Sequence, residues 1–221
     1  MDRTTALHYE LPTQNSWPHT FLQPKLDFES PQFHAGQFHN QTPQPQGIKF
    51  SLFKWLATRR ASTWNVDRDH EFQQFSSATR ELPHDQPNAD MNQWKVWFVG
   101  HATVLIQIGP YNFLTDPVWA EFASPKQGSG PRRVCPAGIA LEQLPHIHAV
   151  LLSHNHYDHM DLATLNWLHK RFNMPIYTGL GNAWYLPKSF HVIELDWWQS
   201  VQVGDTQLVA TPDRKSTRLN S

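Results

Sequence analysis

Three histidines and an aspartate gather within six residues, at His154, His156, Asp158 and His159. They come directly after the apolar segment HIHAVLL and directly before a predicted helix. Side chains two residues apart on an extended strand point the same way, so His154 and His156 can converge on one metal ion. The turn into the helix would present Asp158 and His159 to a second ion.

The types of these side chains favour zinc. Neutral imidazole and carboxylate groups bind zinc at about 2.0–2.2 Å. Four such groups so close together would repel or desolvate one another unless a cation lay among them. Two ions about 3.5–4 Å apart can clamp the oxygens of a phosphoryl displacement, and they lower the pKa of a bound water molecule to about 7. The segment therefore predicts a dinuclear zinc centre with hydrolytic chemistry.

The elements that would position this segment are strands followed by a helix. The stretch KVWFVGHATVLIQIGPYNFLTDPVW predicts three strands, because Gly100 and the pair Gly109-Pro110 interrupt its β-branched and aromatic runs. The segment HIHAVLL predicts a buried strand. A helix should follow with Asp161 as its N-cap, and one face of that helix is apolar: Leu162, Leu165, Leu168 and Phe172.

Further short strands are predicted after this helix, in PIYTG, HVIEL, SVQVG and TQLVAT. No internal repeat with a period of about 20–50 residues is visible. Strands mixed with helices place the chain in the α/β class, in its layered α+β form.

Composition limits the class of protein. The chain has 221 residues and a formal net charge of −1, without the basic balance of nucleic-acid-binding proteins. Its single cysteine, Cys135, excludes an intrachain disulfide framework and a cysteine zinc cluster. The N-terminus lacks a signal-peptide pattern, and no apolar run reaches the roughly 18 residues of a membrane-spanning helix. We therefore expect a cytoplasmic protein, soluble or peripheral to a membrane, that does not bind nucleic acid.

The region before the strands falls into two parts. Residues 1–48 are rich in Gln, Pro and His and poor in aliphatic residues, which predicts an extended arm of low hydrophobicity. Residues 49–93 are expected to form a helical or irregular lead-in. Within it, residues 50–60 have the spacing of a short amphipathic helix, for which two interpretations stay open: packing on the domain and resting on a membrane.

The pattern HxHxDH after a buried strand resembles the metallo-β-lactamase superfamily of zinc hydrolases. Five longer segments are similar to the N-acyl-phosphatidylethanolamine phospholipase D family and its bacterial relatives: VWFVGHATVLIQIG, NFLTDPVW, ASPKQGSGPRR, LLSHNHYDHMD and VIELDWWQ. The resemblance runs from about Trp94 to Pro212. It implies an αβ/βα sandwich that holds two zinc ions at one edge of its sheets.

The resemblance also implies roles for residues of this sequence. His154 and His156 match the family's ligands of the first zinc ion. Asp158 and His159 match those of the second, and Asp158 is also assigned to catalysis. The polar loop at residues 124–133 matches the loop that lines the family's substrate cleft.

Further residues are candidates for roles near this centre. Gln127 in the polar loop and Tyr157 between the ligands are candidate substrate contacts, with packing as an equal alternative for Tyr157. Asp116 either supports the loop at residues 154–159, which we call the metal loop, or forms the turn before Pro117. His101 in GHAT is interpreted as structural or supporting, because no ligand of the family maps to it.

The function implied by the resemblance is that of a zinc-dependent phosphodiesterase of the phospholipase D type. It would hydrolyse N-acyl phosphatidylethanolamine to phosphatidic acid and N-acylethanolamine, with peripheral membrane contact to reach its phospholipid substrate. Two alternatives stay open. One is another hydrolase of the superfamily, acting on a soluble phosphodiester or a lactone, and the other is an inactive partial domain.

The last residues of the sequence differ from the family. After TQLVATP the family has a further histidine ligand, and later a bridging aspartate and a last histidine. Lys215 stands where the first of these is expected, and residues 213–221 resemble a non-native tail. We therefore expect residues 94–212 to form the N-terminal half of the sandwich, and the 221-residue chain to be largely insoluble and inactive.

Overall fold

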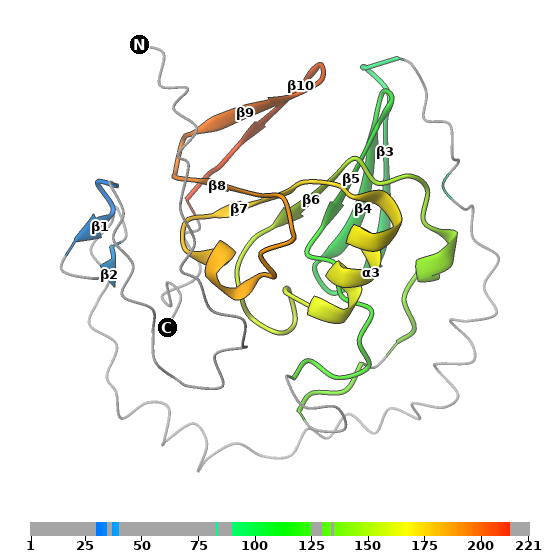
Figure 1. Ribbon diagram of the computed structural model, residues 1–221. Helices are drawn as coiled ribbons and strands as arrows, with labels where there is room; N and C mark the ends of the chain where they lie inside the picture. Colours follow the sequence, from blue (N-terminus) through cyan, green and yellow to red (C-terminus); the bar gives the residue numbers. More distant parts are fainter. Residues whose placement is uncertain are drawn as a thin grey trace, which may run out of the picture.

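The computed structural model describes residues 30–34, 37–39, 83, 90–124, 130–133 and 135–212. Its largest element is a six-stranded sheet with strand order β3-β4-β5-β6-β7-β8 (Figure 1). The strands of this sheet are β3 (Trp94–Gly100), β4 (Thr103–Ile108), β5 (Tyr111–Thr115), β6 (Ala149–Leu152), β7 (Ile176–Gly179) and β8 (Val192–Leu195). The helix α3 (Leu162–Phe172) connects β6 to β7 and lies on one face of the sheet (Figure 1).

The other elements are short. β9 (Ser200–Val203) and β10 (Thr206–Val209) form a separate antiparallel hairpin, and β1 (Phe33–His34) pairs with β2 (Gln37–Phe38). Two 3-10 helices, η1 (Leu141–Gln143) and η2 (Asn182–Tyr185), were not predicted from the sequence. None of the helices in the described ranges combines the length and the apolar character that crossing a membrane requires.

The sheet changes from antiparallel to parallel pairing at β5. β3, β4 and β5 form an antiparallel meander, whereas β5, β6, β7 and β8 pair in parallel. Gly109 makes the β4–β5 turn possible, because its φ is 52° and a Cβ there would collide with the Met91 side chain. Since β5 and β6 run in parallel, the residues after both strands lie at the same edge of the sheet.

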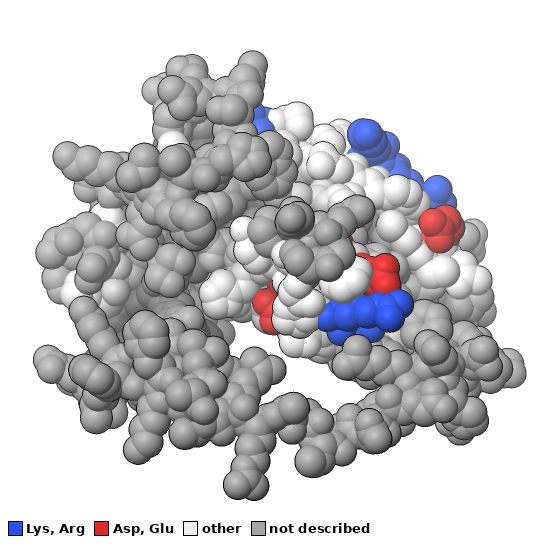
Figure 2. Space-filling view, turned by 90° about the horizontal axis from the view of Figure 1, so that it is seen from below, with Lys and Arg blue, Asp and Glu red and all other residues white. Residues whose placement is uncertain are grey.

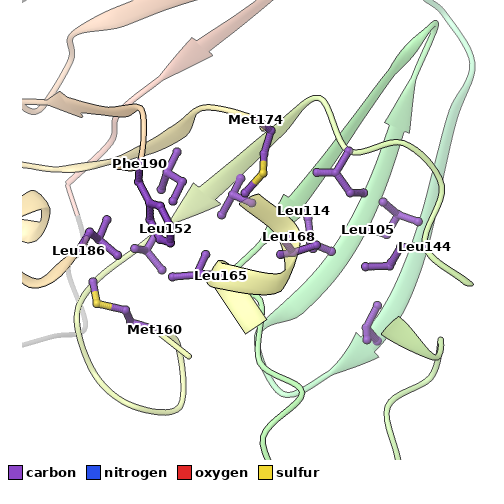
Figure 3. Packing of buried hydrophobic residues seen from close by; sticks show 14 of the residues in the cluster. Leu105, Leu114, Leu144, Leu152, Met160, Leu165, Leu168, Met174, Leu186 and Phe190 are labelled. Atoms are coloured by element: carbon purple, nitrogen blue, oxygen red, sulfur yellow. The ribbon is translucent and has the colours of Figure 1, made fainter. Parts of the chain in front are cut away.

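The main core lies between the sheet and α3. Leu105, Leu114 and Val150 of the sheet pack in one cluster with Leu165 and Leu168 of the helix, and all five are fully buried (Figure 3). Burial of each such side chain stabilises the fold by about 1.5–3 kcal/mol relative to exposure. The apolar face predicted for the helix therefore holds α3 against the sheet.

Asp161 fixes the start of α3. Its Oδ1 accepts hydrogen bonds from the backbone N–H groups of Ala163 and Thr164, at 3.1 and 3.3 Å. Its Oδ2 accepts from the backbone N–H groups of Trp119 and Ala120, at 3.2 and 2.9 Å. The predicted N-cap is thus confirmed, and the same carboxylate ties the helix to the segment after β5.

The opposite face of the sheet is only partly covered. A second cluster joins Ile108, Phe113, Ala149 and Tyr177 of the sheet to apolar residues of the β9–β10 hairpin. On the edge strand β3, three large apolar side chains remain well exposed: Trp94 at 65%, Val96 at 61% and Phe98 at 69%. This row lies on the same face as Ile108 and Ile106 of β4, because these residues pair directly with Trp94 and Val96.

The strands and the helix predicted between residues 94 and 209 are confirmed, and the mixed sheet with its helix is the predicted α/β class. The predicted tail at 213–221 lies outside the described residues. So do most of the predicted arm at 1–48 and most of the lead-in at 49–93, including residues 50–60. The division of the chain at these boundaries stays a prediction.

Candidate metal centre

The four expected ligands lie in the loop between β6, which ends at Leu152, and α3, which begins at Leu162. The loop is a tight turn, because the backbone oxygen of His156 accepts from the N–H groups of both His159 and Met160, at 2.9 and 2.7 Å. The turn folds His159 back toward His154, and their ring centroids are 4.0 Å apart.

His154 and His156 approach each other through their ring nitrogens. Nε2 of His154 lies 3.1 Å from Nδ1 of His156. Two nitrogens that each lie about 2.0–2.1 Å from a tetrahedral zinc ion are separated by about 3.3 Å. The other nitrogen of His154, Nδ1, faces the Ser153 hydroxyl at 2.9 Å. The pair therefore has the spacing of two ligands of one ion.

His159 is held from the other side by Asp116. Nδ1 of His159 lies 2.8 Å from Oδ2 of Asp116, which leaves Nε2 turned toward Asp158 Oδ2 at 3.7 Å. Metal-binding histidines usually donate their second ring N–H to such a carboxylate, and this contact fixes the tautomer and the ring orientation. The hydrogen bond to Asp116 raises the pKa of His159, even though burial acts in the opposite direction.

Asp116 follows β5 and is buried. Its Oδ1 accepts from the backbone N–H of Ser153 and its Oδ2 from the Ser153 hydroxyl, both at 2.7 Å. The residue has a φ of 35°, in the left-handed region, just before Pro117. Both roles considered for Asp116 are thus visible in its geometry: it contacts a metal-loop histidine, and it forms a turn.

Asp158 pairs with His101, which lies in the turn between β3 and β4. Nε2 of His101 is 3.0 Å from Oδ2 of Asp158. His101, Asp158 and His159 each offer one ligand atom, and these three atoms lie within 4.8 Å of one another. The sequence interpretation treated His101 as structural or supporting, and the structure places it directly against an expected ligand.

The charges of the group suit a cation. Burial would raise the pKa of Asp158, but its own backbone, His159 and His101 together lower it, so the carboxylate stays ionised. Burial, together with the neighbouring His159 and His156, lowers the pKa of His154. A neutral imidazole beside an ionised carboxylate is the donor set that divalent metal ions bind.

The other expected site residues are less well placed. Tyr157 is 52% exposed and lies between the ligands in the loop, and Gln127 lies outside the described residues. The described flanks of the polar loop are held together by an Arg132–Glu121 ion pair, with 2.7 Å between Nε and Oε1. On the face shown in Figure 2, the described basic and acidic side chains form small groups beside one another.

Ser153 was not singled out from the sequence. Its hydroxyl donates to Asp116 and also faces Nδ1 of His154. Ser153 therefore connects Asp116 to His154, an expected ligand. Its position directly before His154 at the end of a strand is the signal that could have identified it.

Comparisons with known proteins show the family of this chain. Residues 111–220 match the sequence model of the beta-lactamase superfamily domain. The chain belongs to the metallo-β-lactamase superfamily. One relative of this chain is an uncharacterised protein of Mycobacterium tuberculosis, which is 34% identical over 194 residues. The match covers 84% of this chain and 50% of that protein.

A second relative is the N-acyl-phosphatidylethanolamine-hydrolyzing phospholipase D 1 of Caenorhabditis elegans. It is 35% identical over 111 residues, which is 50% of this chain and 31% of the worm protein. This chain thus spans half or less of the length of these two relatives. A solved structure, the diiron beta-hydroxylase CmlA from Streptomyces venezuelae, is 26% identical with a TM-score of 0.38, and covers 54% of this chain and 24% of that one.

Membership of the metallo-β-lactamase superfamily implies a metal, and the donor set fits one. His154 and His159 each have one ring nitrogen that faces a supporting protein group and a second nitrogen directed toward another member of the set. His156 faces His154 through its Nδ1. The identity of the metal and the role of each residue stay predictions.

Proposed function

We propose that this protein is a zinc-dependent hydrolase of the phospholipase D type. Its substrate would be N-acyl phosphatidylethanolamine, and its products phosphatidic acid and an N-acylethanolamine. The observation that carries the hydrolase proposal is the convergence of His154, His156, Asp158 and His159 at the end of β6. The activity in the name of the worm relative supports the substrate class.

Each residue has a defined part in this proposal. His154 and His156 would hold one zinc ion, and Asp158 and His159 would hold the other. Bound zinc supplies a water molecule of lowered pKa and stabilises negative charge that develops on phosphoryl oxygens. Asp158 stays ionised, so its carboxylate would be available as an anionic ligand of the second ion.

The substrate contacts are proposed more coarsely. Tyr157 is exposed beside the ligands, where its ring and hydroxyl could contact the lipid headgroup. Gln127 is retained as a second candidate in the polar loop. Because the substrate is a membrane lipid, the proposal includes peripheral contact with a membrane surface.

The experiment compares substrates on two proteins. One is the 221-residue chain, and the other continues after residue 212 with the corresponding segment of the mycobacterial relative. Each is supplied with zinc and given N-acyl phosphatidylethanolamine in mixed micelles, a soluble nitrophenyl phosphodiester, and a lactone. We expect the longer protein to release N-acylethanolamine, and His154→Ala to remove this activity while His191→Ala retains it.

The alternatives predict different outcomes. Turnover of the soluble phosphodiester or the lactone with no lipid cleavage would replace the phospholipase proposal by a general hydrolase of the superfamily. Equal activity of the His154→Ala variant would contradict the assignment of the metal loop itself.

A further inference from the structure

His101 adopts a backbone conformation that needs an explanation. It follows Gly100 in the turn between β3 and β4, and its φ is 52°. The left-handed conformation is unfavourable for a residue with a Cβ, because the Cβ comes too close to the following carbonyl oxygen. The side chain is 57% exposed, so burial does not account for this conformation.

Thr115 and Arg133 lie on the two sides of this turn. The hydroxyl of Thr115, at the end of β5, donates to the backbone oxygen of Ala102 at 2.7 Å. On the other side, a Cβ at Gly100 would lie 3.0 Å from Nη1 of Arg133. The guanidinium of Arg133 is anchored in turn, because its Nη2 donates to the backbone oxygen of Val118 at 2.6 Å. The hydrogen bond from Thr115 therefore holds the turn beside His101 without contacting its ring.

The ring of His101 is directed at the metal loop. Its Nε2 is 3.0 Å from Oδ2 of Asp158, a residue 57 positions away in the sequence. Its ring also meets that of His159 edge-on, with 5.3 Å between centroids. An exposed side chain on a strained turn thus makes its polar contact with an expected ligand.

Asp116 shows the same combination of features. It too has a positive φ, at 35°, and it contacts His159, the other expected ligand of the second ion. Among the described residues, His101 and Asp116 are two of the four non-glycine positions with positive φ. Strained conformations persist where the surroundings over-determine them, and they cluster at functional sites.

We propose that His101 is a positioning residue for Asp158. It would orient Asp158 in the same way that Asp116 orients His159. Its Nε2–H donates to Oδ2 of Asp158 and fixes the rotation of the carboxylate, which holds Oδ2 3.7 Å from Nε2 of His159, the other expected ligand of the second ion. This proposal rests on the proposed metal centre. It differs from a structural role, which would act on folding, and from direct ligation, in which His101 would itself bind the ion.

Two substitutions separate these roles. His101→Phe keeps a ring of similar size without a hydrogen-bond donor, whereas His101→Gln keeps an N–H donor at a similar reach. His159→Ala serves as the control that removes a ligand. His191→Ala serves as the neutral control, because that exposed residue contributes its backbone oxygen to Ile176. The 221-residue chain and its extended form are both used, and circular dichroism verifies folding.

The readout is zinc binding, measured by competition with a chromophoric chelator. We expect His101→Phe to lower the affinity for the second zinc ion by about 10- to 100-fold and to leave the affinity for the first ion unchanged. His101→Gln should restore most of the affinity. With cobalt in place of zinc, the absorption of the His101→Gln protein should match that of the unsubstituted protein, because the ligand set is the same.

Three outcomes would overturn the proposal in distinguishable ways. An unchanged second zinc affinity in His101→Phe, with a loss in His159→Ala, refutes the role of His101 and leaves the metal centre standing. No effect of either substitution refutes the metal centre as well. Failure of His101→Gln to restore binding, with a changed cobalt spectrum, would make His101 a ligand rather than a positioning residue.

Discussion

At the scale of single residues, Asp116 connects the sheet to the metal loop. Its oxygens accept from the backbone N–H and the hydroxyl of Ser153, and Oδ2 lies 2.8 Å from Nδ1 of His159. Its own backbone also participates, because its oxygen accepts from the Thr103 hydroxyl at 2.7 Å. One carboxylate thus orients His159, an expected ligand, and connects the end of β5 to Ser153 after β6.

Removal of this carboxylate should affect both stability and metal binding. Asp116→Ala leaves the donors of Ser153 without an acceptor, which costs about 1–3 kcal/mol. Loss of the contact with His159 should lower the zinc affinity by about 10- to 100-fold. Urea unfolding and zinc competition measure the two effects. Glu121→Gln, which breaks only the exposed ion pair with Arg132, should change stability by at most about 1 kcal/mol. Equal effects of the two substitutions would contradict the special role of Asp116.

In the metal-free protein, the pKa values of His159 and His154 should be shifted in opposite directions. The hydrogen bond to Asp116 raises the pKa of His159, whereas burial lowers that of His154. The stability contributed by protonated His159 is therefore complete below the unfolded pKa of about 6.5, and it is lost as pH rises through the folded pKa. For His154 the folded pKa lies below the unfolded one, so protonation of this residue costs stability as pH falls.

Nuclear magnetic resonance titration of the histidine ring protons can check this order. Asp116→Asn should bring the pKa of His159 down toward the ordinary value. Zinc binds the neutral imidazole, so its affinity should rise with pH through the pKa of His159. A pKa of His159 below that of His154 would contradict the geometry.

At the scale of elements, the start of α3 is tied to two parts of the chain. Asp161 caps the helix through Oδ1 and holds the Trp119–Ala120 backbone through Oδ2. Since α3 begins three residues after His159, this capping also limits the freedom of the metal loop.

Asp161→Ala should therefore destabilise the protein by about 2 kcal/mol, the upper end of the usual cost of an N-cap. Asp161→Asn keeps one acceptor oxygen for the cap and should cost less. The midpoints of urea unfolding give both values. If the Asn variant lost as much as the Ala variant, the contacts with Trp119 and Ala120 would matter more than the cap.

At the scale of the whole molecule, one face of the sheet presents apolar surface to solvent. Trp94, Val96 and Phe98 alternate along β3, which is an edge strand of the sheet. An apolar row on an exposed edge strand is a template for pairing with other chains. This surface is a physical reason to expect self-association of the chain.

Replacing Trp94 and Phe98 by threonine should increase the soluble fraction and reduce self-association, because threonine suits a strand but removes most of the apolar surface. Sedimentation velocity and the yield of soluble protein measure the change. Val209→Thr is the matched control, because Val209 is also an exposed apolar residue, at 49%, but lies on β10. An equal gain from the control would show that exposure alone, rather than the edge of β3, governs association.

Much of the fold could be predicted because its signals are local. The strand β6 shows as an apolar run, α3 shows through its spacing of leucines, and Asp161 shows as a cap directly before them. The four expected ligands also lie within six residues, so a metal site in this loop could be predicted from the sequence. The short 3-10 helices were missed because neither has a hydrophobic period long enough to detect.

The sequence by itself determined the strands, the capped helix and the metal loop, since each depends on neighbours a few residues apart. Only the tertiary structure decided which side chains hold that loop. Asp116 lies 43 residues from His159, and His101 lies 57 residues from Asp158. These contacts exist because β5 pairs in parallel with β6 while β3, β4 and β5 fold back on one another, which brings distant strand ends to one edge. No local pattern of side chains specifies that pairing, because it depends on the packing of the whole sheet.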